Sequence, residues 1–316
     1  MNSKELVTLA LNILSCAQKD LAKRLGVSPT QISKWKNGEH MSGEMEKKLR
    51  TITKIGDADP SFVLASGSVQ DAITWERLIH YLAVNARDSA ETGYDTYPLN
   101  DELGLLCGET FSVLGEMGVA LPKEFPKELD LDFENADSDK IWGAIEENPH
   151  TNLIHAIYKS LNDVYGFYAA FISELFDDEE LDLMATSAGN IEPCLMSLAA
   201  CKIEVSPELA TKFREFKFRT TKDYREWLAI VKDRAFRAGV PLRAELLDLI
   251  HSSPDELSHD AEAESFGIND SRVHPDIYMN ELLVGMRTIH QVLPAIMKTL
   301  GIYNDFKLDT SELRIE

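Results

Sequence analysis

Residues Gln18–Gly38, QKDLAKRLGVSPTQISKWKNG, predict two short helices joined by a tight turn. Small and apolar residues repeat at helical spacing through the first half of this stretch: Leu21, Ala22 and Leu25. Gly26 follows where a left-handed residue would end the first helix, a conformation that glycine adopts at little cost. Ser28 is a suitable N-cap and Pro29 a suitable first residue for the second helix.

The second helix has one apolar side and one polar side. Ile32 and Trp35 are three residues apart, which places them on one stripe that we expect to be buried. Four polar residues lie on the other faces, where a partner can reach them: Thr30, Ser33, Lys34 and Asn37. The same short helix can therefore pack into a core and present a surface for recognition.

This stretch resembles the helix-turn-helix of the Cro and phage-repressor (XRE-like) family. The resemblance rests on a small residue where the helices cross, a glycine at the turn and two apolar residues facing the core: Ala22, Gly26, Ile32 and Trp35. Gln18, Asn37 and Gly38 also fit. The resemblance covers about residues 1–56, under a fifth of the 316 residues, and no family is recognised in the remainder.

The resemblance implies particular roles on DNA. In that family the second helix lies in the major groove, with its N-terminal residues over base edges. Base contacts are thus implied for four residues: Pro29, Thr30, Ser33 and Lys34. Lys34 would donate to guanine O6 and N7, and the Thr30 methyl would face thymine. Pro29 departs from the family pattern, because its side chain cannot hydrogen-bond a base. An ordinary solvated lysine is the alternative interpretation of Lys34.

Phosphate contacts are implied for a second set of residues: Gln18, Gln31, Lys36 and Asn37. Such contacts fix the register of a protein on DNA without reading its sequence. The charge distribution agrees with this implication, because residues 1–56 hold ten Lys and Arg against five Asp and Glu, a net charge of +5. The other 260 residues then carry −26 of the total of −21. A basic segment on an acidic chain fits a DNA-binding protein whose larger part stays off the phosphates.

The whole sequence predicts an all-α fold, because helical periodicity recurs throughout and no strand alternation runs longer than a few residues. Helices over residues 3–16, capped by Ser3, and from Ser42 to Gly56 are expected to flank the central pair. Further helices are expected over these segments: 69–90, 100–117, 139–147, 151–176, 181–205 (one helix or two, broken at Pro193), from Pro207 with Ser206 as the cap, 241–250, and 279–300 with Pro294 inside or between halves. The segment 251–275 is polar and predicts loops.

Three parts follow from these elements. Residues 1–56 form the helix-turn-helix DNA-binding domain, and residues 57–68 a hinge, since they hold GDADP and Ser-Gly-Ser. Residues 69–316 form a large helical C-terminal region for dimerisation, sensing or partner binding. A subdivision near residues 121–139 fits the two prolines and many acidic residues there, which indicate a connection.

The stretch Lys212–Arg243 is unlike its surroundings. It holds ten basic residues against four acidic ones, with six aromatic residues interleaved: Phe213, Phe216, Phe218, Tyr224, Trp227 and Phe236. One interpretation is a second nucleic-acid surface. The other is a set of amphipathic helices whose aromatic residues are core and whose cations pair with the acidic part of the chain. We favour the second, because aromatic residues at helical spacing are usually core.

Other kinds of site have little support in the sequence. The four cysteines, Cys16, Cys107, Cys194 and Cys201, form no CxxC pair and indicate buried free thiols in a reducing compartment. The chain has no phosphate loop, GxSxG or HExxH motif. Two Glu-x-x-His pairs, Glu147 with His150 and Glu256 with His259, are interpreted as chance matches because Pro149 interrupts the first and the second lies in a loop-like stretch. We expect no enzyme activity, no metal and no cofactor.

The location of the protein is also predicted. The apolar stretch before Cys16 mimics a short lipoprotein signal, but Glu5 and Asn12 interrupt it and its periodicity is helical. No apolar run is long enough to span a membrane. We therefore expect a cytoplasmic protein with no membrane partner.

The function predicted from these features is that of a sequence-specific transcriptional regulator, a repressor acting as a homodimer on a pseudo-palindromic site in double-stranded DNA. A small-molecule or protein effector would act at the C-terminal region. The alternative is an interaction or regulatory protein of a phage, plasmid or defence system, whose N-terminal domain targets DNA or autoregulates. An enzyme with a fused autoregulatory domain is a third and weaker hypothesis.

Overall fold

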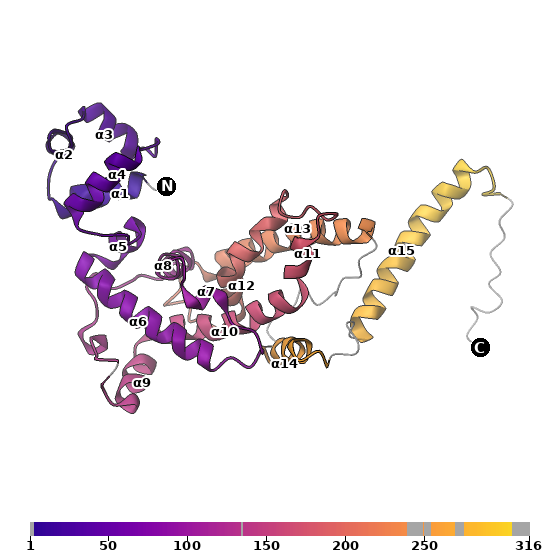
Figure 1. Ribbon diagram of the computed structural model, residues 1–316. Helices are drawn as coiled ribbons and strands as arrows, with labels where there is room; N and C mark the ends of the chain where they lie inside the picture. The colour runs from indigo at the N-terminus through magenta and orange to yellow at the C-terminus, as the bar shows by residue number, and fades with distance from the viewer. Residues whose placement is uncertain (1–2, 134, 239–248, 250–253, 269–274, 305–316) are drawn as a thin grey trace.

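A computed structural model of the chain describes residues 3–133, 135–238, 249, 254–268 and 275–304. These residues form an all-α fold of fifteen α-helices and three short 3-10 helices (Figure 1). Val119 and Ala210 form one isolated antiparallel bridge. The expected fold class is confirmed. The predicted helix at 241–250 lies outside the described residues, apart from residue 249.

The first four helices form a small unit that we call the head, residues 3–53. Its helices are α1 (Ser3–Ile13), α2 (Gln18–Leu25), α3 (Pro29–Lys36) and α4 (Gly43–Thr53). Gly26 ends α2 in the left-handed conformation, with φ of 72°, and the Ser28 hydroxyl caps α3 by accepting from the Gln31 N–H at 3.1 Å. The helix end predicted at Gly26 and the helix start predicted at Ser28 are therefore both confirmed.

The ends of the outer two helices differ from the prediction. α1 stops at Ile13, not at residue 16, and Ser3 lies within it. The Ser3 hydroxyl donates to the Glu39 carbonyl at 2.8 Å. α4 ends at Thr53 with Lys54 in the left-handed conformation, two residues before the expected Gly56.

The segment expected to be a hinge, residues 57–68, contains helix α5 (Pro60–Ser66). The Asp59 carboxylate caps this helix by accepting from the N–H groups of Ser61 and Phe62. Phe62 and Val63 are buried, and α5 packs against α1 on one side and against α6 and α8 on the other. One continuous apolar core therefore runs from the head into the rest of the protein.

The remaining helices, apart from α15, form a larger unit that we call the body, residues 69–265. Its described α-helices are α6 (Val69–Asp88), α7 (Tyr97–Asn100), α8 (Leu106–Glu116), α9 (Ser138–Glu147), α10 (Pro149–Phe171), α11 (Ser173–Asp177), α12 (Leu195–Lys202), α13 (Phe213–Ala238) and α14 (Pro254–Ser265). Three 3-10 helices complete it: η1 (Lys127–Leu129), η2 (Ser187–Asn190) and η3 (Glu192–Cys194).

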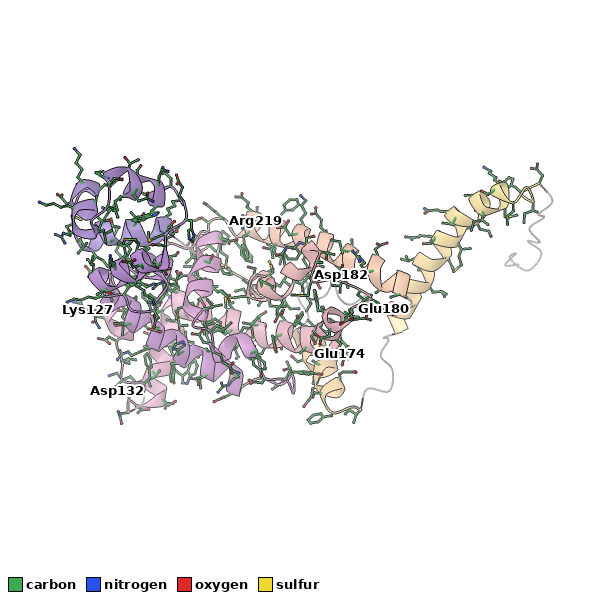
Figure 2. All side chains as sticks on the ribbon, turned by 45° about the horizontal axis from the view of Figure 1, so that its top comes forward. Lys127, Asp132, Glu174, Glu180, Asp182 and Arg219 are labelled. Atoms are coloured by element: carbon green, nitrogen blue, oxygen red, sulfur yellow. The ribbon has the colours of Figure 1, made fainter. Side chains whose placement is uncertain are left out.

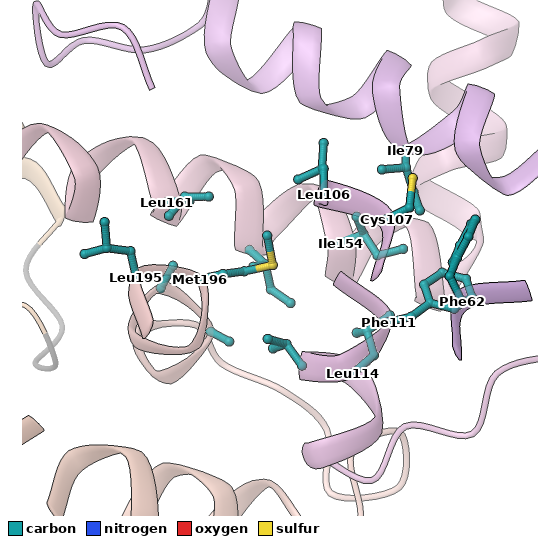
Figure 3. Packing of buried hydrophobic residues seen from close by; sticks show 14 of the residues in the cluster. Phe62, Ile79, Leu106, Cys107, Phe111, Leu114, Ile154, Leu161, Leu195 and Met196 are labelled. Carbon is teal, nitrogen blue, oxygen red and sulfur yellow. The ribbon is translucent and has the colours of Figure 1, made fainter. Parts of the chain in front are cut away.

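The long helix α10 organises the body, because α6, α9, α11, α12 and α14 all pack against it. Figure 3 shows side chains from α8, α10 and α12 meeting in one apolar core, with Leu114, Leu161 and Met196 among them. Two hydrogen bonds fix this packing from inside. The Thr110 and Tyr158 hydroxyls lie 2.6 Å apart between α8 and α10, and the Asn162 amide donates to the Ala86 carbonyl of α6 at 2.6 Å.

Several predicted segments have other structures. The helix expected from Asn100 to Met117 begins only at Leu106 as α8, and Asn100, its expected cap, is instead the last residue of α7. The helix expected over residues 181–205 is confined to η2, η3 and α12, and the helix expected from Pro207 begins only at Phe213. The segment 251–275, expected to be loop-rich, contains α14. Residues 121–139 form a connection as expected, with only the single turn η1 within it.

The last described helix, α15 (Pro275–Thr299), contains Pro294 in its interior and matches the final helix expected from the sequence. It extends away from the body in both Figure 1 and Figure 2. Within the part of the chain that is described, no helix is both long enough and apolar enough to cross a membrane.

Candidate nucleic-acid interface

The outer face of α3 carries the residues for which DNA contacts are implied. Six of them are exposed: Pro29, Thr30, Ser33, Lys34, Lys36 and Asn37. Gln18, at the start of α2, and Gln31 are half-buried. In Figure 1, α2 and α3 lie on the side of the head that faces away from the body. A DNA duplex can therefore approach this face without meeting the acidic body.

The inner face of α3 holds the helix in position. Ile32 is fully buried and Trp35 is 4% exposed, as their spacing predicts. The Trp35 indole N–H also donates to the His40 carbonyl at 3.1 Å, while Ser3 binds the Glu39 carbonyl from α1. The loop after α3 is thus tied to both α1 and α3, so the outer residues of α3 project from a fixed support.

One ion pair on this face was not found from the sequence. The Lys34 ammonium lies 3.5 Å from the Glu39 carboxylate, and both side chains are about half exposed. Gly38, with φ of 89°, turns the chain back, and the Glu39 N–H donates to the Lys34 carbonyl at 3.1 Å. Lys34 must leave this carboxylate before it can donate to a guanine. The Asn-Gly pair after α3 was the available signal, since such a turn returns the chain over the last helical turn.

The start of α2 is open to an anion. Residue 17 is alanine, and α2 has no side-chain N-cap. The first N–H groups of a helix without a cap have no partner inside the helix and carry its positive dipole end. Gln18 stands at this end, where the helix dipole favours an anion and the carboxylate of Asp20 in the same turn opposes one, so its phosphate contact stays a prediction.

The cations of the head fall into two groups. Among the described residues, ion pairs hold three of the nine Lys and Arg of the head: Lys34 with Glu39, Lys48 with Glu44 at 2.8 Å, and Arg50 with Glu46 at 3.0 Å. Arg50 also donates to the Gly56 and Ala58 carbonyls, so it stabilises the approach to α5. Lys36, by contrast, is exposed and has no ion pair within the described residues, which leaves it available for a phosphate.

A family comparison assigns this part of the chain. Residues 14–49 match the family model described as helix-turn-helix, a match that spans α2 and α3 in full and reaches Leu49 of α4. The N-terminal region is therefore a helix-turn-helix of the Cro and phage-repressor type, the class of domain that binds DNA. No curated protein and no solved structure matches the chain.

Most of the basic stretch Lys212–Arg243 forms the long helix α13, and residues 239–243 lie outside the described residues. The aromatic residues of α13 differ in burial. Phe216 and Tyr224 are buried, and Phe213 and Trp227 pack partly buried against the core. Phe218 is 72% exposed. The side chain of Phe236 lies outside the described residues. Most of the described aromatic residues are therefore core, as the favoured interpretation expects.

The cations of α13 are only partly paired. Arg219 binds Glu116 of α8, and Lys222 lies 3.6 Å from Glu226 on the same helix. Arg214, Lys217 and Arg225 have no ion pair within the described part of the chain. Whether this outer face contacts nucleic acid stays a prediction.

The structure does not bring metal ligands together in the residues that it describes, where no group of three His, Cys, Asp or Glu could hold an ion. The His150 ring Nε2 lies 3.0 Å from the Ala120 carbonyl oxygen. Cys107 and Cys201 are buried as expected, but Cys16 and Cys194 are only partly buried. Burial raises the pKa of Cys201 to about 12, so this thiol stays protonated near neutral pH.

Proposed function

We propose that the protein is a sequence-specific transcriptional regulator that represses by binding a pseudo-palindromic operator as a homodimer. The observation that supports this most directly is the exposed polar face of α3, held outward by buried Ile32 and Trp35 within a matched helix-turn-helix. Side chains on such a face can reach base edges in the major groove. The net charge of +5 on residues 1–56 supplies attraction to phosphates.

The dimer follows from the limited reading capacity of one head. A single recognition helix contacts only a few base pairs, which is too little to specify a site in a genome. Proteins with this motif pair two heads on half-sites about 34–36 Å apart, one turn of DNA. A protein bound in this way would block access to the DNA that it covers, which is the simplest form of repression.

The test is selection of bound genomic fragments by the full-length chain, followed by footprinting of the enriched sequences. We expect a motif with two-fold symmetry and half-site centres one helical turn apart. Lys34→Ala, on the outer face, should relax sequence preference, whereas Lys217→Ala on α13 should leave the selected motif unchanged. Failure to bind any DNA at low salt would instead favour a protein that acts through partners, in which the helix-turn-helix has a secondary role.

A further inference from the structure

Helix α15 exposes an apolar face that no described helix covers. Eight large apolar residues on one side of it are 42–64% exposed: Leu282, Leu283, Met286, Ile289, Val292, Leu293, Ile296 and Leu300. Soluble proteins seldom leave a contiguous apolar patch of this kind in water, and such patches mark interaction sites. The position of α15, extended away from the body in Figures 1 and 2, leaves this face open to a partner.

The spacing along this face is that of helices that pack in pairs. Six apolar residues follow one another at intervals of four, three, four, three and four: Leu282, Met286, Ile289, Leu293, Ile296 and Leu300. This is the 3.5-residue repeat by which two helices interlock side chains along a seam. Leu283 and Val292 flank the seam, so the face is wider than two rows and suits a broad contact.

The charges of α15 favour a second copy of the same helix as the partner. Its acidic residues, Asp276 and Glu281, lie toward its beginning, and its basic residues, Arg287 and Lys298, lie further along. Two copies in antiparallel orientation place the acidic end of each beside the basic end of the other. The helix dipoles also oppose each other in this arrangement. Such a contact is self-complementary about a two-fold axis.

The apolar face is large enough to be an interface. Its eight exposed apolar residues present on the order of 800 Å² in the single chain, which is the most that they can bury and is close to what each partner contributes to an interface of standard size. A membrane surface is a poorer fit, because helices that lie on membranes carry many Lys and Arg on their polar side. The polar side of α15 has only Arg287 and Lys298.

We propose that the protein dimerises through antiparallel pairing of α15 with α15 of a second copy. The purpose of this dimer, which is to bring two heads onto one operator, rests on the proposed function. The physical argument for the contact does not. It places the interface at the C-terminal end of the described chain, far from the helix-turn-helix. The body then does not have to form a dimer contact of its own.

The experiment compares two single-charge variants of the full-length chain by sedimentation equilibrium without DNA. Ile289→Glu puts a charge at the centre of the seam, and Gln291→Glu puts the same charge on the opposite, polar side of α15. Both positions are exposed, so neither change should disturb the fold of the monomer. We expect a dimer for the wild type and for Gln291→Glu, and at least a 30-fold higher dissociation constant for Ile289→Glu, the size of an interface hot spot. A wild-type monomer at tens of micromolar, or an Ile289→Glu dimer of unchanged stability, would overturn the inference.

Cross-linking tests the orientation. Glu281→Cys and Lys298→Cys chains, each mixed with a flexible bis-maleimide, should cross-link efficiently only when the two variants are combined, with the wild type measuring the background from its own four cysteines. Efficient cross-linking of each variant alone would show parallel pairing and overturn the proposal. DNA binding is measured separately on a single half-site. A dimer that binds no half-site would refute the proposed function and leave this inference intact, whereas a monomer that binds one would overturn this inference and the dimeric part of the proposed function but leave DNA binding by the head intact.

Discussion

Replacing Glu39 by glutamine should strengthen DNA binding, although the change removes an ion pair from the head. The Lys34 ammonium lies 3.5 Å from the Glu39 carboxylate in the free protein. Both side chains are about half exposed, so the pair is screened and stabilises the head by only about 0.2–1 kcal/mol. That amount must be given up when Lys34 turns to DNA. Glutamine keeps the shape of Glu39 and removes the charge that holds Lys34.

The expected gain follows from these quantities. Recovering roughly 0.2–1 kcal/mol corresponds to an about 1.4- to 5-fold tighter complex, since 1.4 kcal/mol is a factor of ten. Loss of one negative charge beside the phosphates adds to this at low salt and fades as salt rises.

Fluorescence anisotropy with the selected site, in a salt series, measures both quantities on the full-length chain. Glu44→Gln is the matched control, because it makes the same charge change and breaks the 2.8 Å pair with Lys48 on α4 instead of α3. Lys34→Ala and the double variant close a thermodynamic cycle that isolates the coupling between the two residues. If Glu39→Gln weakens binding as much as Lys34→Ala does, then Glu39 contacts DNA or orients Lys34 in the complex, and the reasoning fails.

Three other predictions concern α3 and α13, the two helices with exposed lysine and arginine side chains that the sequence analysis singled out. Lys36→Ala should weaken binding to all sequences alike and shallow the salt slope by roughly 0.9, because a phosphate contact is sequence-blind; a changed sequence preference at constant slope would make Lys36 a base reader. Trp35→Ala should cost about 3–5 kcal/mol in the head, because it empties a buried site and removes the bond to the His40 carbonyl; hydrogen exchange over residues 3–53 should then lose its protection, and unchanged protection would contradict the packing. The double variant Arg214→Glu and Lys217→Glu should alter DNA affinity less than 2-fold, and a larger loss in the same anisotropy assay would establish α13 as a second nucleic-acid surface.

The helix-turn-helix could be predicted because its signals are local. Gly26 is recognised because it takes the left-handed conformation at the end of α2. Ser28 and Pro29 are recognised because they fit the cap and the first turn of α3. Each of these residues acts on backbone groups within a few positions of itself. The ion pair between Lys34 and Glu39 is equally local, but it depends on the direction in which Gly38 turns the chain.

α5 was missed although its start signal is of the same kind. Asp59 followed by Pro60 is an N-cap and a first helical residue, the pattern used correctly at Ser28 and Pro29. The glycines on either side of this segment favoured the interpretation of a hinge. Phe62 and Val63 are buried only because α5 packs against α1, α6 and α8, and these contacts are not visible in the sequence of the segment itself.

Other misses come from tertiary contacts that override a valid local signal. Ser206 and Pro207 form an acceptable helix start, yet α13 begins only at Phe213. The intervening residues are drawn to the end of α8, where Ala210 bridges Val119 and the Lys212 N–H donates to the Met117 carbonyl at 2.9 Å. Residues about ninety positions apart make these bonds, and no pattern within either segment indicates them.

Helix α5, which lies within the segment 57–68 expected to be a hinge, bears on how the head would act on DNA. A flexible hinge would let each head find its own half-site, so operator spacing would be loosely specified. α5 instead packs against α1 and the body together, and the ring centroids of Phe62 and Phe111 lie 4.8 Å apart across its contact with α8. Arg50 adds hydrogen bonds from α4 to the Gly56 and Ala58 carbonyls. With head and body joined in this way, a homodimer of the proposed kind would hold its two α3 helices at a distance set by the dimer itself. Recognition would then depend on half-site spacing as well as on the bases that α3 would contact.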